Sequence, residues 1–184
     1  MRDSGITRII LTVALVSAVA CDLRADNPTT FTVHSAVDDS TFELAQHKGK
    51  PVVLHFLLKT ECPYCMRYTH DYAALAETTP DVVHVFLKPD TAMEIKAWAG
   101  KLSKEGLKDL PVIYRDPDAA LATQYQIPDG YKFHGQSVHF PALVALDADG
   151  KELFRYVGKS NSDRMKVKEF SKKLDEHLRA KTSK

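Results

Sequence analysis

The sequence predicts an α/β domain in which a central mixed sheet is flanked by helices. An almost unbroken apolar run at residues 51–58 has the pattern of a strand that is buried on both faces. Apolar residues at helical spacing follow at 66–77, directly after that strand. Further strand-like and helix-like segments alternate along the rest of the chain, which favours helices packed on the faces of a sheet.

The remaining elements are predicted from the same periodicities. A short hairpin is expected at 31–33 and 41–44, turning at 38–40, and residues 127–139 are expected to form a polar loop. Trp98 is expected to be a packing residue, and Asp116 and Pro117 to begin a helix as its cap and first residue. The other strands are predicted at 82–87, 110–114, 141–146 and 152–157, the last two antiparallel, and the other helices at 92–102 and 162–179.

Length and composition indicate one globular domain behind a leader. The chain has 184 residues, 44% of them hydrophobic, and a formal net charge of +1. Such a balance gives no sign of nucleic-acid binding or of an acidic substrate.

The first 25 residues have the pattern of a signal peptide. Arg2 and Arg8 precede an apolar run at 9–16, and small residues follow at 17–20. The apolar run is too short for a comfortable membrane span. We therefore expect a signal peptide at 1–25, a linker at 26–30, a domain at 31–180, and an extracytoplasmic location, periplasmic or secreted. Residues 18–21 also loosely resemble a bacterial lipoprotein box, so a lipid anchor at Cys21 is an alternative to simple removal.

The dithiol Cys62-Pro63-Tyr64-Cys65 stands between the buried strand and the helix that follows it. Cys62 is expected at the helix N-terminus, where free amide groups and the helix dipole favour a thiolate. Cys65, one turn later, is expected to be more buried. A zinc half-site is the structural alternative, but zinc usually needs a second cysteine pair and the only other cysteine is Cys21.

This arrangement resembles the thioredoxin superfamily, and in particular its TlpA-like and AhpC/TSA, or redoxin, branches. The N-terminal hairpin and the strand–helix insertion at 110–125 are the features that it shares with those branches. By resemblance, Cys62 attacks or is attacked, Cys65 resolves the mixed disulfide, and Pro141 is a cis proline that faces the dithiol. Substrate contacts are expected from Pro63, Tyr64 and the backbone of Phe140.

Several positions depart from the patterns of these relatives. The proline and threonine that peroxiredoxins carry before their reactive cysteine are His55 and Lys59 here. The buried aspartate of thioredoxin is replaced by Phe56, and the usual aromatic residue before the first cysteine by Glu61. Glu61 should oppose a thiolate at Cys62, whereas Lys59 should favour one. The CPYC tetrapeptide itself is familiar from glutaredoxins.

The resemblance implies an exported thiol–disulfide oxidoreductase that exchanges disulfides with partner proteins and draws electrons from a membrane or soluble redox donor. We expect no cofactor, no resident metal and no nucleic acid. A thiol peroxidase of peroxiredoxin type is the first alternative, with Cys62 reacting with peroxide and Cys65 condensing with the sulfenic acid. A copper-binding protein of the same fold is the second, in which His134 or His139 joins the dithiol.

Overall fold

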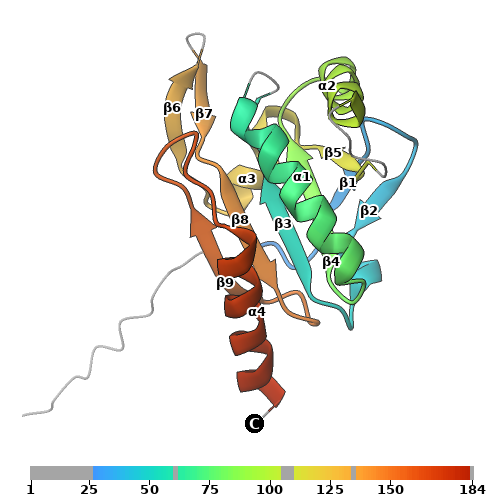
Figure 1. Cartoon of the computed structure of the whole chain (residues 1–184), viewed down its shortest axis with the longest axis vertical. Coiled ribbons are helices and arrows are strands. Elements are labelled where there is room, and N and C mark those ends of the chain that lie inside the picture. Colours follow the sequence, from blue (N-terminus) through green and yellow to red (C-terminus); the bar gives the residue numbers. More distant parts are fainter. Residues whose placement is uncertain (1–26, 60–61, 105–109, 134–135, 183–184) are drawn as a thin grey trace, which may run out of the picture.

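The computed structural model describes residues 27–59, 62–104, 110–133 and 136–182. Its centre is a mixed five-stranded sheet with the strand order β5-β4-β3-β8-β9 (Figure 1). Strands β3, β4 and β5 run parallel, while β8 and β9 are antiparallel to their neighbours. The predicted α/β class is therefore confirmed. The five strands are β3 Val52–Phe56, β4 Val83–Lys88, β5 Ile113–Arg115, β8 Ala142–Leu146 and β9 Glu152–Val157.

Helices cover one face of the sheet, and the N-terminal hairpin with a short helix covers the other. Helices α1 (Pro63–Thr78), α2 (Ala92–Lys104) and α4 (Val167–Thr182) share one core with alternate residues of the strands. Helix α3 (Ala120–Gln124) and the hairpin β1 (Thr32–His34) and β2 (Thr41–Glu43) share the second core. Helices α1 and α4 lie side by side across the sheet (Figure 1).

Most of the predicted elements are confirmed to within a few residues. The hairpin is antiparallel and pairs Val33 with Phe42. A single 3-10 turn at Leu44–His47 connects it to β3. The side chain of Trp98, in α2, is buried in the core of the domain, as expected of a packing residue.

Three segments differ from the prediction. The expected polar loop at 127–139 contains a second antiparallel hairpin, β6 (Asp129–Phe133) and β7 (Gln136–His139), which stands at the same end of the sheet as the start of α1 (Figure 1). Tyr131, Phe133 and Val138 supply the strand-forming residues that the glycines and histidines of this segment obscured.

The helix expected from Asp116 is split into a 3-10 turn, Pro117–Ala119, and α3. Asp118 and Ala119 have φ of 55° and 53°, so the backbone breaks between the two pieces. Asp116 nevertheless caps α3, because its carboxylate accepts the N–H groups of Leu121 (2.7 Å) and Ala122 (3.0 Å).

The closing helix begins at Val167 and not at residue 162, so residues 158–166 form a connecting segment. Two hydrogen bonds hold it: the carboxylate of Asp163 accepts the Tyr156 hydroxyl and the Lys159 amide. A Cβ at Gly158 would lie 2.3 Å from the Asp163 carbonyl oxygen, so the segment packs closely on the end of β9.

The expected signal peptide and Cys21 lie outside the described residues. Within the expected linker, Asn27 and Pro28 are bound to the domain. The Asn27 amide oxygen accepts from Arg155 at 3.1 Å, and the Pro28 carbonyl accepts from the Tyr125 hydroxyl at 3.3 Å. Among the described helices, none has the length and apolar character needed to cross a membrane.

Candidate active site

The dithiol lies where β3 passes into α1. Cys62 is the N-cap residue of α1, with φ −76° and ψ 107°, and Pro63 is the first helical residue, where its missing N–H is not needed. The Cys62 N–H donates to the Lys59 carbonyl at 3.0 Å, which fixes the turn into the helix. Both cysteines are free thiols, with 7% of Cys62 and none of Cys65 exposed. The predicted order of exposure is confirmed.

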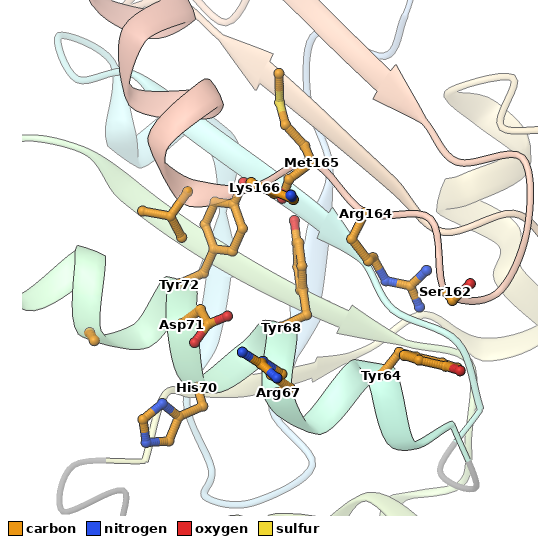
Figure 2. Close-up of a pocket in the computed structure, with 12 residues that line it drawn as sticks. Tyr64, Arg67, Tyr68, His70, Asp71, Tyr72, Ser162, Arg164, Met165 and Lys166 are labelled. Carbon is orange, nitrogen blue, oxygen red and sulfur yellow. The ribbon is translucent and has the colours of Figure 1, made fainter.

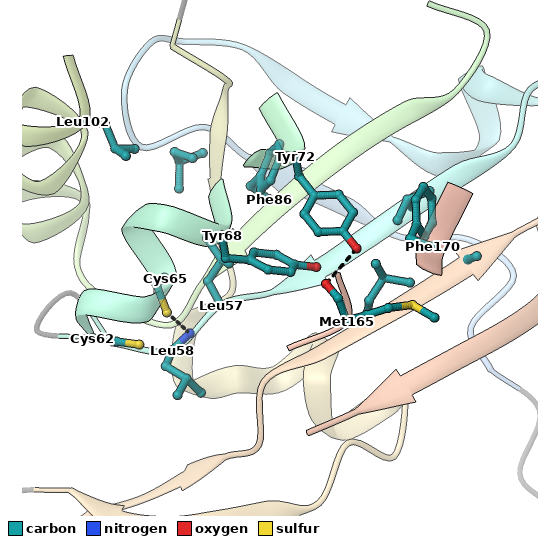
Figure 3. Packing of buried hydrophobic residues seen from close by; sticks show 14 of the residues in the cluster. Leu57, Leu58, Cys62, Cys65, Tyr68, Tyr72, Phe86, Leu102, Met165 and Phe170 are labelled. Carbon is teal, nitrogen blue, oxygen red and sulfur yellow. Dashed lines mark hydrogen bonds between the residues drawn. The ribbon is translucent and has the colours of Figure 1, made fainter. Parts of the chain in front are cut away.

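Arg164 connects the two sulfurs. Its Nη2 lies 3.5 Å from Cys62 Sγ and 3.3 Å from Cys65 Sγ, within hydrogen-bond distance of both. The Leu58 N–H also donates to Cys65 Sγ at 3.4 Å (Figure 3). The dithiol therefore has a cation on one side and a backbone donor on the other, and both stabilise a negative charge on sulfur.

The two thiols share one proton. Burial opposes ionisation of Cys65, but the hydrogen bond from Cys62 and the charges of Lys88 and Arg164 lower the pKa of Cys65 to about 6. The same hydrogen bond, together with burial, raises the pKa of Cys62 far above its ordinary value. The pair therefore gives up its first proton readily and its second only with difficulty. The first ionisation belongs to the pair, because the hydrogen bond between the two sulfurs lets either of them carry the charge. The expected thiolate at Cys62 stays a prediction.

A buried cation, Lys88, also stabilises a negative charge on Cys65. Lys88 is fully buried at the end of β4, with its ammonium donating to the Leu58 carbonyl, 3.6 Å from the carboxylate of Asp90 and 4.4 Å from the centre of the Trp98 ring. Burial lowers the pKa of Lys88, and the Cys65 and Asp90 charges partly restore it. Arg164 and Lys88 are thus the cations whose charges lower the pKa of Cys65. Glu61 lies outside the described residues.

Pro141 lies near the site but not as predicted. Among the described residues there is no cis peptide bond, so the prediction of a cis Pro141 was wrong. A trans proline suits the start of β8, because the carbonyl of Pro141 accepts the Gly158 N–H at 2.8 Å and no donor is needed there. Pro141 does line a small hollow together with Tyr68 and Arg164, the residue that contacts both sulfurs.

Phe140 does not offer free backbone groups. Its N–H donates to the Pro128 carbonyl at 2.9 Å, and its carbonyl accepts from His139 Nδ1 at 2.7 Å. Its ring occupies the space where a side chain at Gly130 would be. The expectation that Phe140 pairs with an extended substrate is therefore not met in this conformation. Pro63 and Tyr64, by contrast, are exposed at the helix start, with 48% of Tyr64 open to solvent.

A chain of hydrogen-bonded rings lies beneath the dithiol. His55 Nδ1 is bonded to the Tyr68 hydroxyl at 2.8 Å, and His55 Nε2 to His84 Nδ1 at 2.9 Å. Burial lowers the pKa of His55 well below its ordinary value, and the neighbouring His84 lowers it further. Burial also lowers the pKa of His84, to about 4, so both rings are neutral. His55, which stands at the proline position of peroxiredoxins, is therefore a core residue. The Tyr72 hydroxyl closes the cluster by donating to the Met165 carbonyl at 3.1 Å (Figure 3).

The structure does not bring a metal-binding group together. Within the described ranges, no three side chains among His, Cys, Asp and Glu are placed to hold a metal ion. His139 is buried in β7 and bonded to a neighbouring carbonyl, and His134 lies outside the described residues. The copper alternative gains no support from these positions.

Sequence reasoning missed Arg164 and Lys88. Arg164 was assigned to the closing helix and lies 102 and 99 positions from its two sulfur partners. Lys88 did carry a signal, because it follows His84 and Phe86 at a spacing of two along β4 and so shares their face. A lysine on the same strand face as His84 and Phe86 was the signal in the sequence that could have indicated it.

Comparisons with known proteins agree with this fold. The family model described as Redoxin matches residues 24–174, most of the chain. No curated protein matches the sequence closely enough to count as a relative. Solved structures similar to it include a secreted disulfide oxidoreductase of Mycobacterium tuberculosis homologous to E. coli DsbE, at 21% identity and a TM-score of 0.58, covering 80% of this chain and 96% of that one.

Peroxiredoxins are among the similar structures as well. The yeast mitochondrial 1-Cys peroxiredoxin has a TM-score of 0.69 at 15% identity, covering 82% of this chain and 73% of its own. The bacterioferritin comigratory protein of Xanthomonas campestris, whose structure concerns alkyl peroxide reduction, has a TM-score of 0.61 at 16% identity, covering 82% and 90%. At these identities the likeness concerns the fold.

The fold and the buried dithiol define a thioredoxin-like redox protein. Within that class, the match over residues 24–174 shows that the chain belongs to the redoxin family.

Proposed function

We propose that this protein is a thiol–disulfide oxidoreductase that acts on partner proteins. The observation that carries the proposal is the shared contact of Arg164 with two unequal thiols, one at the surface end of the helix and one fully buried. Disulfide exchange requires an accessible nucleophile and a second thiol that can resolve the mixed disulfide. Cys62, the more exposed of the two at 7%, supports the first role, and the fully buried Cys65 supports the second.

The reaction follows from this geometry. The negative charge passes to Cys62, whose sulfur attacks one sulfur of the partner disulfide, and the other partner sulfur leaves as a thiolate that takes up a proton. Cys65 then attacks Cys62 Sγ, which breaks the mixed disulfide and releases the second partner thiolate. The partner gains two electrons and two protons, and the protein ends with a Cys62–Cys65 disulfide. Arg164 stabilises the charge on whichever sulfur carries it.

Export is part of the proposal. Arg2, Arg8 and the apolar run at 9–16 support a signal peptide, with a lipid anchor at Cys21 as its variant. In an oxidising compartment a dithiol needs a donor to return it to the reduced state, so a membrane or soluble redox donor is proposed as the second partner.

Peroxide reduction is a second candidate function, because a guanidinium beside Cys62 Sγ would also stabilise the developing charge on a peroxide oxygen. The Cys62 thiolate would attack one oxygen, the other would leave as hydroxide or alkoxide, and Cys65 would condense with the sulfenic acid and release water. His55 weighs against this reading, since its ring is bonded within the core and does not reach the sulfur.

A trapping experiment tests the main proposal. In cells that export the full chain, Cys65→Ser should accumulate mixed disulfides with partner proteins, because no internal thiol remains to release them. Non-reducing electrophoresis followed by identification of the adducts measures this. Cys62→Ser is the matched control and should trap far less, since Cys65 is fully buried.

Two outcomes would count against the proposal. Recovery of only monomeric Cys65→Ser, with Cys62 shown to be an ionised free thiol, would exclude exchange with proteins. Stronger trapping by Cys62→Ser would reverse the roles of the two cysteines.

A further inference from the structure

A groove lies along α1. It has a volume of about 760 Å³ and lies between the outer face of α1 and residues 162–167, the segment that leads into α4 (Figure 2). Its α1 wall extends from Tyr64 to Ala74. Ten residues of helix at 1.5 Å each give a length of about 15 Å, which matches about four or five residues of extended chain. The shape therefore suits a peptide segment.

The groove adjoins the dithiol through Arg164. Arg164, which contacts Cys62 and Cys65, is one of its lining residues, and Tyr64 stands beside them at the helix start. A chain bound in the groove would thus place a cysteine at its end against Cys62. The aromatic rings of Tyr64, Tyr68 and Tyr72 give the groove an apolar floor on which a peptide backbone can lie (Figure 2).

The charge of the groove is positive although the chain as a whole is nearly neutral. Arg67, Arg164 and Lys166 line it, against the single carboxylate of Asp71, and His70 lies at its edge. Arg67 and Lys166 are exposed, and neither is in an ion pair with another of the described residues. Arg164 Nε is buried and has no hydrogen-bond partner within the described part of the chain. The two exposed cations Arg67 and Lys166 therefore make the groove complementary to an acidic ligand.

We propose that this groove binds an acidic segment of about four or five residues next to the reacting cysteine of the partner protein. Arg67 and Lys166 determine the preference for carboxylates, and Arg164 keeps its role at the sulfurs. The inference rests on the proposed function, because it names the class of protein segment that the dithiol would act on.

Model peptide disulfides test the preference on the reduced full domain. Three peptides are compared, each with one cysteine followed by four residues that are rich in Glu, Gln or Lys, and each joined to an uncharged 2-thiopyridyl group. Release of the thione measures the rate of attack, and each rate is divided by that of dithiothreitol with the same peptide, which removes differences in intrinsic reactivity. We expect the Glu peptide to react about tenfold faster than the Gln peptide at low ionic strength, and the gap to close in high salt.

The variant Arg67→Gln/Lys166→Gln should bring the ratio of Glu to Gln rates close to one. Lys96→Gln/Lys151→Gln removes the same charge from exposed sites outside the groove and should leave the ratio unchanged.

Each other result is decisive as well. Equal rates for the three peptides would overturn the acidic preference but leave disulfide exchange intact. No reaction with any peptide, from a protein with ionised thiols, would overturn the proposed function itself. If glutathione disulfide reacts as fast as the Glu peptide with the same loss in Arg67→Gln/Lys166→Gln, the groove serves a small carboxylate-bearing disulfide and not a protein segment.

Discussion

The two faces of the central sheet differ in chemistry although the same strands build both. On the face covered by α3 and the N-terminal hairpin, β3 and β4 present Leu54, Phe56, Val85 and Leu87, all buried among apolar neighbours. On the face covered by α1, α2 and α4, the alternate residues include His55, His84 and Lys88. Both cysteines lie on this second face.

The difference shows where the protein places its polar groups. On the second face His55 is bonded to Tyr68 and His84, and Lys88 to the Leu58 carbonyl, so much of the cost of burying these groups is offset locally. The first face needs only close packing. Changes on the first face should therefore affect stability alone, whereas changes on the second face should also affect the sulfurs or make stability depend on pH.

The largest expected effect is on the apolar face. Phe56 is 1% exposed, and Phe56→Ala should lower the free energy of unfolding by about 3–5 kcal/mol, because it removes a buried ring and leaves a cavity. Urea denaturation measures the loss. The pH at which half of the dithiol is ionised, measured from the pH dependence of iodoacetamide alkylation, should stay the same. A shift of this pH would show that the two faces are coupled.

Acid should lower the stability of the protein through the histidines of the second face. The pKa values of His55 and His84 lie below the ordinary 6.5, so the folded protein keeps both neutral while the unfolded chain takes up protons. Stability is therefore complete above about pH 6.5 and lost as the pH falls toward about 4, by on the order of 2–3 kcal/mol. Urea unfolding at pH 7 and pH 4.5, in a Cys62→Ser/Cys65→Ser background, measures this loss.

The matched variant for this test is His55→Phe/His84→Phe/Tyr68→Phe, which removes the chain without leaving a buried polar group unpaired. Its stability should change little over the same pH range. The control variant His70→Gln replaces an exposed histidine, and it should show the full loss of stability in acid. Equal acid loss in the triple variant would assign the effect to other groups.

Removing the buried ion pair should affect the sulfurs more than the fold. Lys88 lowers the pKa of Cys65, so Lys88→Met/Asp90→Asn should raise the first pKa of the dithiol above about 6, by about one unit. The pH profile of alkylation measures it, and Lys96→Met serves as the control at an exposed site. An unchanged profile would leave Arg164 as the only effective cation.

The smallest effect is expected with peroxide. His55 is held in the core and supplies no group to a peroxide at Cys62, so the reduced protein should consume hydrogen peroxide no faster than a free thiolate of the same pKa. Stopped-flow mixing measures the rate. A much faster reaction would favour the peroxidase function and would mean that polar groups of the second face contact a peroxide at Cys62.

Periodicity along the chain was enough to predict the sheet, its flanking helices and the position of the dithiol. The apolar run at 51–58 and the prolines and glycines that end elements act locally, and local patterns survive in a linear sequence. The hairpin β6–β7 was missed because its strand residues are interrupted by glycine and histidine. The true start of α4 was missed because hydrogen bonds of Asp163 to β9 and to Lys159 hold the preceding segment out of the helix.

The sequence by itself determined that two thiols would stand at a helix start, one more exposed than the other. Only the tertiary structure decided which charges surround them. Arg164 contacts the sulfurs from about a hundred residues away in the sequence, and the charge of Lys88, at the end of a neighbouring strand, lowers the pKa of Cys65. A pKa depends on distances in space and on burial, and neither of these is contained in the spacing of residues along the chain.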